Sequence, residues 1–66
     1  MYILGINAYH PDSSACIIND GVLITAIEEE RITRIKNDRR FPIESIRQCL
    51  DISGISIEDI DAICVY

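Results

Sequence analysis

Hydrophobic residues of this 66-residue chain fall into short runs that polar or glycine-containing turns interrupt. A mainly apolar run from Tyr2 to Ala8 predicts a first strand, and the run from Ser14 to Ile18 predicts a second. Asn19-Asp20-Gly21 follows, and Asp-Gly between apolar runs is a strong hairpin signal because glycine accepts the positive φ of tight turns. We therefore expect a third strand from Val22 to about Glu28, and an antiparallel meander of the three strands.

After a charged segment, the spacing of the hydrophobic residues changes from that of a strand to that of a helix. Phe41-Pro42 is typical of a helix start, because proline at the first helical position has its φ preset and loses no needed donor. Apolar residues at helical spacing form one face of this helix, and we expect that face to pack against the sheet as part of the core. This face consists of Ile43, Ile46 and Leu50, with Cys49 beside them. Gly54 is placed to end the helix in a left-handed cap.

A fourth strand should close the sheet. Residues Ser56 to Asp59 predict a short capping turn, and the apolar run from Ala62 to Tyr66 predicts a buried strand. A helical crossover of this length permits that strand to lie parallel to the first, on the side away from the meander. The predicted fold class is therefore α/β with strand order 3-2-1-4. This β-β-β-α-β order is the opening of the ribonuclease-H-like fold shared by actin-like ATPases and sugar kinases.

Length and composition indicate a segment that folds but is small. Hydrophobic residues make up 48% of the chain, which argues against disorder, whereas so short a chain supports only a marginal core. We expect the chain to be the amino-terminal part of one domain of a larger enzyme, completed by the rest of the same polypeptide. Exposed strand edges should favour self-association of the isolated piece.

Charge and cysteine usage narrow the possible partners. The net charge of −5 disfavours nucleic acid and anionic membranes as partners. Basic residues gather between Arg31 and Arg40, after the acidic run Glu28 to Glu30, which we expect to be solvated and to form salt bridges with Arg31 and Arg34. Three widely spaced cysteines favour buried free thiols in a reducing cytosol. The sequence has neither an apolar run of membrane-spanning length nor a leader, so we expect a cytoplasmic protein.

The loop between the first two strands is the best candidate for chemistry. It contains His10, the only histidine of the chain, together with Asp12, Ser13 and Ser14. A rigid sheet can aim such side chains at its lip, although the two serines are also suited to cap the turn by bonding to the backbone. Walker and dinucleotide glycine motifs are absent, and one histidine does not support a zinc hydrolase.

Three motifs occur in order along the chain. They are Gly-Ile-Asn-Ala-Tyr-His-Pro-Asp-Ser-Ser-Ala at 5–15, Glu-Glu-Glu-Arg-Ile-Thr-Arg-Ile-Lys at 28–36, and Phe-Pro at 41–42. Together they strongly resemble the amino terminus of the O-carbamoyltransferases of nodulation-factor and antibiotic biosynthesis, over almost the whole chain. The resemblance implies an enzyme that converts carbamoyl phosphate and ATP into carbamoyl-adenylate in one domain and transfers the carbamoyl group to a substrate hydroxyl in another. This chain resembles the start of the transfer domain.

The resemblance also assigns roles to residues. It implies that His10 is the general base for the acceptor hydroxyl. It implies nucleotide contacts at Lys36, Arg31 and Arg34, and contacts to the hydroxylated small-molecule acceptor at Ala8, Asp12 and Ser13. Many family members place the histidine and aspartate side by side, whereas Pro11 intervenes here. Divalent iron is implied for the full-length family protein, with its ligands outside this segment and no metal ligand within it.

Two other classes of protein remain as alternatives. A sugar kinase or a tRNA threonylcarbamoyl-transfer protein shares the fold, but these proteins usually open the first hairpin with an acid and lack the Glu-Glu-Glu-Arg block. A non-catalytic binding or assembly module would pair with a partner through its open edge strands. A long reading frame that continues past Tyr66 would favour the enzyme, and a stop codon there would favour the module.

Overall fold

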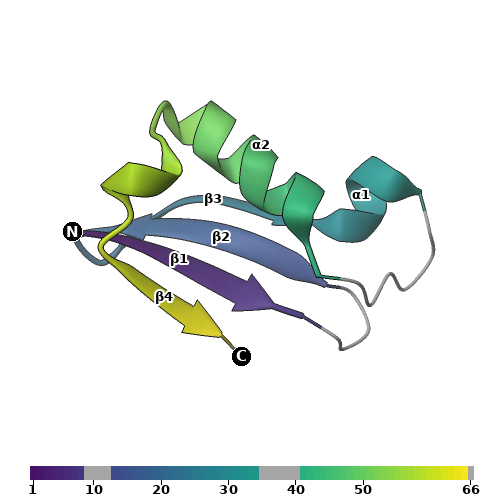
Figure 1. Cartoon of the computed structure of the whole chain (residues 1–66), viewed down its shortest axis with the longest axis horizontal. Coiled ribbons are helices and arrows are strands. Elements are labelled where there is room, and N and C mark those ends of the chain that lie inside the picture. The colour runs from purple at the N-terminus through teal and green to yellow at the C-terminus, as the bar shows by residue number, and fades with distance from the viewer. Residues whose placement is uncertain (9–12, 35–40, 66) are drawn as a thin grey trace.

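The computed structural model describes residues 1–8, 13–34 and 41–65 of the chain. It shows a four-stranded mixed sheet with a long helix across one face (Figure 1). The elements are β1 (Tyr2–Asn7), β2 (Ser14–Asn19), β3 (Val22–Glu28), α1 (Glu29–Thr33), α2 (Ile43–Ser53), the 3₁₀ helix η1 (Ile57–Asp59) and β4 (Ala62–Val65). The predicted strands and the predicted helix are confirmed to within about a residue at their described ends. The expectation that the fourth strand is buried is wrong, because β4 lies at an edge of the sheet and all its described residues are exposed. The short helix α1 was not predicted.

The strand order β3-β2-β1-β4 is the predicted one. The meander β1-β2-β3 is antiparallel, and β4 lies parallel to β1 after the α2 crossover. The tight turn between β2 and β3 has positive φ at both central residues, 51° at Asp20 and 80° at Gly21. Two positive φ values are what a type I′ hairpin turn requires, so the Asp-Gly prediction is confirmed.

Helix α2 begins and ends close to the predicted signals. Pro42 is the residue before the first turn, where its carbonyl accepts a bond from the Ile46 N–H at 3.0 Å. Gly54 has φ of 72°, and its N–H bonds the carbonyl of Asp51, so the left-handed cap is confirmed. The capping turn before β4 is also confirmed, because the Ser56 N–H donates to the Asp59 carboxylate at 2.9 Å. None of the described helices is long and apolar enough to span a membrane.

The core lies between α2 and the strands β2 and β3, on which α2 packs. It consists of Leu4, Ile6, Ala8, Ala15, Ile17 and Cys49, with Tyr2, Ile27, Ile46, Leu50, Ile55 and Ile60 packed against it. Ser45 and Cys49 are fully buried on the sheet side of α2. The expectation that Ile43 belongs to this face is wrong, because Ile43 is 50% exposed. It lies two residues from buried Ser45, and such a separation places two side chains on opposite sides of a helix.

The other face of the sheet is more open and contains small residues. Cys16 and Cys64 are the lateral partners of Gly5 on β2 and β4, so all three lie on this face. Cys16 is half-buried and Cys64 is exposed, which corrects the expectation that all three cysteines are buried. Cys16 is more accessible because the described helix α2 packs on the opposite face, where Cys49 is the fully buried thiol. Cys64 is exposed because β4 is an edge strand whose described residues are all exposed.

We expect Gly5→Ala to lower the free energy of unfolding by about 1–3 kcal/mol, because overpacking a tight site displaces its neighbours. A Cβ at residue 5 would lie 2.7 Å from the Cys16 sulfur. The double variant Gly5→Ala/Cys16→Ala removes that sulfur and should recover most of the loss in urea unfolding. If the effects of the two substitutions simply add, the clash is not the cause.

Candidate functional site

Polar side chains gather where β1 ends, β2 begins and β3 ends. Asn7 pairs with Ser14 across β1 and β2, and Ser14 pairs with Glu28 across β2 and β3. The three residues therefore form a row across the sheet at the end from which the loop of residues 8–13 leaves (Figure 1). Because lateral partners share a face, their side chains lie on the face opposite to α2.

A hollow of about 640 Å³ lies over this face, and the row forms its polar end. Its apolar part includes Ile3, Ile18, Ala26 and Cys64. Arg31 from α1 also lines the hollow and is its one basic residue among those described. A concave apolar surface with a few convergent polar groups is the usual form of a small-molecule site. Carboxylate, amide, hydroxyl and guanidinium together can recognise a ligand that bears both hydroxyls and a phosphate.

Sequence reasoning named Ser14 in the candidate loop but did not identify Asn7 and Glu28 as site residues. Asn7 and Glu28 were assigned to strands, and Ser14 was also considered as a residue that caps the turn. The signal that could have found them is the hairpin register, which places the last residue of β1, the first of β2 and the last of β3 side by side. That register is fixed by the Asp20-Gly21 turn and by the alternation of core residues along β1 and β2.

The two ends of the candidate loop are buried. Ala8 is 5% exposed and belongs to the hydrophobic core, while Ser13 is fully buried. The Ser13 hydroxyl has no hydrogen-bond partner within the described part of the chain, so the structure provides no capping bond from this side chain. His10 and Asp12, which the resemblance placed in the acceptor site, lie outside the described residues. The structure therefore fixes the flanks of this loop and leaves those two roles as predictions.

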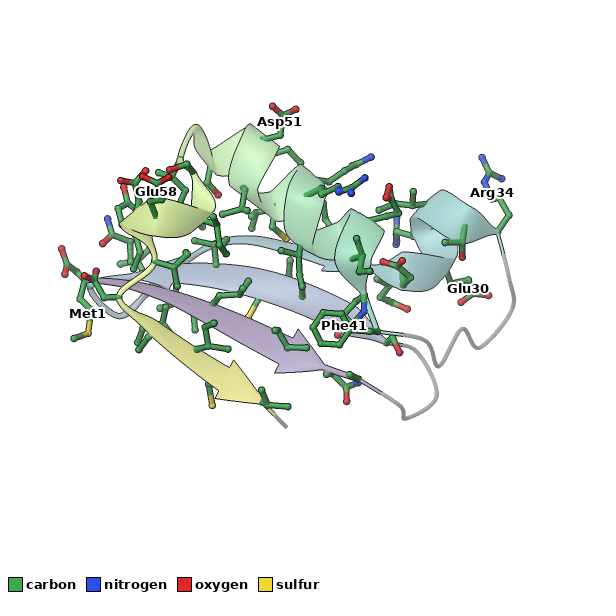
Figure 2. The ribbon with its side chains drawn as sticks, viewed as in Figure 1. Met1, Glu30, Arg34, Phe41, Asp51 and Glu58 are labelled. Atoms are coloured by element: carbon green, nitrogen blue, oxygen red, sulfur yellow. The ribbon has the colours of Figure 1, made fainter. Side chains whose placement is uncertain are left out.

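The three basic residues that the resemblance assigned to the nucleotide differ in where they lie relative to the hollow. Arg31 is exposed and lines the hollow. Arg34 ends α1 in a left-handed conformation with φ of 63°, and its side chain extends away from the sheet (Figure 2). Lys36 lies outside the described residues. Thus the structure brings Arg31, but not Arg34, to the polar row of Asn7, Ser14 and Glu28.

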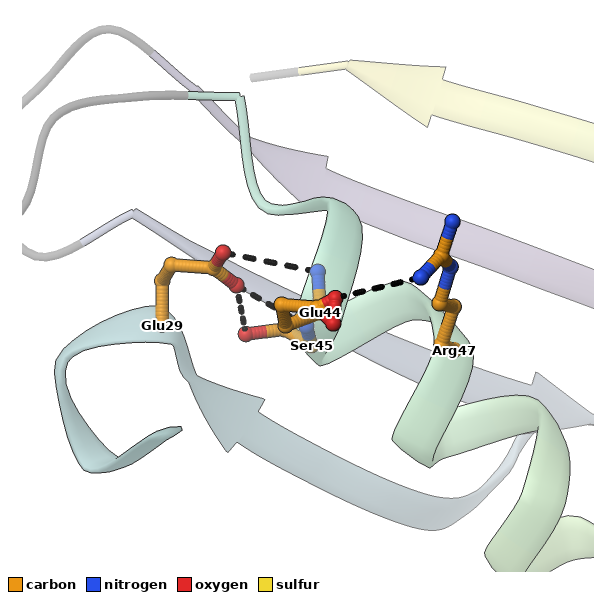
Figure 3. Close-up of polar contacts among 4 residues, drawn as sticks. All are labelled: Glu29, Glu44, Ser45 and Arg47. Carbon is orange, nitrogen blue, oxygen red and sulfur yellow. Dashed lines mark hydrogen bonds and ion pairs between the residues drawn. The ribbon is translucent and has the colours of Figure 1, made fainter. Parts of the chain in front are cut away.

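Glu29 differs most from its predicted environment. The acidic run was expected to be solvated and paired with Arg31 and Arg34, but Glu29 is only 3% exposed. Its Oε1 accepts hydrogen bonds from the Ser45 N–H at 2.8 Å and the Ser45 hydroxyl at 2.7 Å (Figure 3). Among the described residues, ion pairs join Met1 to Asp20 and Glu44 to Arg47, and none involves the acidic run. Glu28 is exposed, as expected. For Glu29 the expectation is wrong, because the free amides of the α2 amino terminus attract its carboxylate more strongly than exposed arginines do.

The buried thiol of Cys49 is a structural group. Burial raises the pKa of Cys49, and neighbouring Cys16 adds to the increase. Its sulfur donates a hydrogen bond to the Ala15 carbonyl at 3.4 Å. A raised pKa keeps the thiol protonated near neutral pH, and a protonated, buried thiol is a poor nucleophile. Cys49 is therefore unsuited to covalent catalysis.

Comparison with known proteins agrees with the motifs. The family described as Carbamoyltransferase N-terminus matches residues 2–66. Nodulation protein NolNO of Sinorhizobium fredii is 42% identical over 60 residues, which cover 91% of this chain and 9% of that protein. An uncharacterized protein of Synechocystis sp. is 48% identical over 65 residues, which cover 98% of this chain and 11% of that protein.

A further relative is much shorter, so the chain covers a larger share of its length. An uncharacterized 19.2 kDa protein in the syrM 5' region of Rhizobium etli is 42% identical over 60 residues, or 91% of this chain and 35% of that protein. The chain thus spans about a tenth of two relatives and about a third of the other. The resemblance found in the motifs at 5–15, 28–36 and 41–42 is confirmed. Since the family match extends over nearly all of its residues, the chain belongs to the carbamoyltransferase family, in the amino-terminal region of that family.

Proposed function

We propose that the polypeptide containing this chain is an ATP-dependent O-carbamoyltransferase, and that the loop end of the sheet forms part of its transfer site. The observation that carries the proposal is the match of residues 2–66 to the Carbamoyltransferase N-terminus family. The polar row of Asn7, Ser14 and Glu28 supports it, because these side chains flank the loop that contains His10. Activity is assigned to the full-length polypeptide, since the chain spans only part of its relatives.

The proposed transfer step needs one base. The acceptor hydroxyl oxygen attacks the carbonyl carbon of carbamoyl-adenylate, which earlier steps form from carbamoyl phosphate and ATP. A C–O bond to the acceptor forms, the bond between the carbonyl carbon and the AMP oxygen breaks, and AMP leaves. The hydroxyl proton passes to a neutral imidazole, whose pKa near neutrality suits it to accept a proton at physiological pH. His10, the only histidine of the chain, is assigned this role.

The polar row is suited to the acceptor. An amide, a hydroxyl and a carboxylate supply both donors and acceptors, which matches the hydroxyls of a sugar or the amines of an aminoglycoside. Asp12 and Ser13 belong to the same proposed acceptor site, where Ala8 contributes only its backbone and small size because its side chain lies in the core. The guanidinium of Arg31 suits the phosphate of the adenylate. Arg34 and Lys36 are proposed to assist it.

Divalent iron does not fit the described part of this chain. The described residues bring together no group of three or more histidine, cysteine, aspartate or glutamate side chains. A divalent metal centre of the kind that iron enzymes use needs about that many protein ligands. We therefore derive no step through the metal and propose that any iron ligands belong to other parts of the polypeptide.

We further propose a fold and a location. The order β3-β2-β1-β4, with β4 parallel to β1 after a helical crossover, is the opening of the ribonuclease-H-like fold of actin-like ATPases. In that fold the first hairpin loop faces nucleotide phosphate or the transferred group, which supports the position of the site. The free cysteines, one of them exposed, support a reducing compartment such as the cytoplasm.

The activation half of the proposed function can be tested without knowing the acceptor. The full-length protein is given ATP, carbamoyl phosphate and a divalent iron salt, and pyrophosphate release is followed with and without carbamoyl phosphate. Adenylation predicts that pyrophosphate forms only when both substrates are present. Formation of ADP without pyrophosphate would instead indicate a kinase-like or simple ATPase reaction.

We propose that the isolated chain self-associates through its edge strands β3 and β4. The β3 edge exposes three consecutive apolar residues, Val22, Leu23 and Ile24. Such an edge is a template for strand pairing, and a lysine on it opposes that pairing. We therefore expect larger species to appear with concentration in sedimentation velocity, and Leu23→Lys to abolish them while the matched exposed change Glu58→Lys does not. A parent chain that stays monomeric at all concentrations would contradict the proposal.

A further inference from the structure

The Glu29 residue joins three parts of the chain that lie far apart in sequence. Its carboxylate accepts bonds from the first turn of α2, from the Ser45 N–H and hydroxyl and from the Glu44 N–H at 3.4 Å. Its own backbone N–H donates to the carbonyl of Ser13 at 2.8 Å. Glu29 is also the first residue of α1. One residue therefore fastens the start of α1 to residue 13 and also to the start of α2, as Figure 3 shows.

The hydrogen bonds to the Glu29 carboxylate are strong enough to hold α1 and α2 in a fixed relative position. A carboxylate removed from water requires donors, and hydrogen bonds to an ionised acceptor are stronger than those between neutral groups. Helix α2 has no side-chain cap from its own preceding residue, Pro42. Glu29 supplies that cap from another segment, and the positive end of the α2 dipole favours its negative charge. Since Glu29 is almost completely buried, water does not compete for these donors.

The parts of the chain that Glu29 joins are adjacent in sequence to the residues that have roles in the proposed function. Ser13 directly follows the segment that contains His10, and α1 and α2 lie on either side of the segment that contains Lys36. Helix α1 also carries Arg31, which lines the hollow on the open face of the sheet. Glu29 thus connects the chain next to the proposed base with the chain next to the proposed nucleotide contacts.

We infer that Glu29 is a positioning residue of the transfer site, which holds the flanks of the His10 and Lys36 segments in a fixed relation. This inference rests on the proposed carbamoyl transfer. Glu29 does not touch substrate in this account, because its carboxylate is occupied by α2 on the side away from the hollow. It acts through Ser13 and α1, because a displacement of either would move the residue that follows the His10 segment or the helix that carries Arg31.

The test compares two matched variants in the full-length protein. Glu29→Gln keeps the size of the side chain but replaces one carboxylate oxygen by an NH₂ group, which faces backbone donors. We expect kcat of carbamoyl transfer to fall about 10- to 100-fold, as a displacement near 1 Å does in other sites, while carbamoyl-phosphate-dependent pyrophosphate release stays at the parent rate. Glu30→Gln makes the same change of charge one residue away, where the side chain makes none of these bonds, and should transfer at the parent rate.

A loss of folded protein must be separated from a loss of positioning. Leu50→Ala weakens the packing of the same helix without touching Glu29, and all rates are measured well below the melting temperature of each variant. We expect Leu50→Ala to transfer at the parent rate under these conditions. Should Glu29→Gln fail to fold, Ser45→Ala takes its place, because it removes one of the donors and leaves the carboxylate, and several-fold slower transfer is then expected.

The outcomes distinguish this inference from the function on which it rests. Transfer at the parent rate by folded Glu29→Gln, or by Ser45→Ala in its place, would overturn the positioning role while the proposed function stands. An equal loss in Leu50→Ala would also overturn it, because stability alone would then explain the effect. If the parent protein itself transfers no carbamoyl group, the proposed function fails, and this inference fails with it.

Discussion

Replacing His10 with Asn should lower the rate of carbamoyl transfer by about 10² to 10⁴-fold, the usual contribution of one general base. Asparagine is similar in size and can still donate and accept hydrogen bonds, but it cannot take up the proton of the acceptor hydroxyl. Carbamoyl-adenylate formation should continue at the parent rate, because no acceptor oxygen is deprotonated in that step. The measurement is a comparison of pyrophosphate release with carbamoylated product in the same sample.

Lys36→Ala is the matched comparison for His10→Asn. Its expected effect is weaker binding of nucleotide or adenylate, because an ammonium group suits phosphate as a point charge. The two variants should therefore differ in kind, with a lower kcat of transfer for His10→Asn and a higher KM for Lys36→Ala. Transfer at the parent rate by both variants would show that neither residue has the role that the family resemblance assigns.

Replacing Ile17 with Ala should lower the free energy of unfolding by about 2–5 kcal/mol, since it removes buried methyl and methylene groups and leaves a cavity. Ile17 is fully buried between the sheet and α2. Native domains have only about 5–15 kcal/mol of stability in total, so this loss is a large share of it and should clearly lower the midpoint of urea unfolding. Urea unfolding followed by circular dichroism measures the loss.

Val22→Ala provides the control for Ile17→Ala. Val22 is also a β-branched strand residue that becomes alanine, but it lies at the exposed edge and is 62% exposed. Surface substitutions of this kind usually change stability by less than about 0.5 kcal/mol. Equal losses from the two substitutions would mean that β-propensity, rather than the core against α2, accounts for the stability of β2.

Much of the fold could be predicted because its signals are local. Asp20-Gly21 specifies its hairpin through two positive φ values, and Gly54 specifies the end of α2 in the same way. The apolar alternation along β1 and β2 fixes which side chains meet α2. Parallel pairing of β4 with β1 followed from the length of the crossover, which limits the possible connections.

The rest depended on contacts between distant segments. Nothing near Glu29 in sequence indicates that Ser45 will supply its donors, so the acidic run was interpreted as solvated. Ile43 was wrongly placed in the core because α2 turns Ser45 and Cys49, and not Ile43, toward the sheet. Likewise, the exposure of Cys64 follows from the position of β4 at an edge of the sheet, beyond the strands on which α2 packs. Local patterns give the elements, whereas these side-chain environments arise only when the elements meet.

The candidate site was predictable only in part. The family motifs point to the loop between β1 and β2, and the structure places the polar row of Asn7, Ser14 and Glu28 beside the two ends of that loop. Of the basic residues, Arg31 meets the hollow and Arg34 does not, because α1 ends in a left-handed turn that the charge pattern does not reveal. The roles of His10, Asp12 and Lys36 stay predictions.

The most direct test of the account is mass spectrometry of acceptors after reaction with the full-length protein. The protein is given ATP, carbamoyl phosphate, a divalent iron salt and a panel of hydroxylated sugars and aminoglycosides. The account predicts that an acceptor gains the mass of one carbamoyl group, that the gain requires ATP, and that His10→Asn abolishes most of it. Absence of any carbamoylated product under all these conditions, from a folded protein, would contradict the account and favour a non-catalytic binding module.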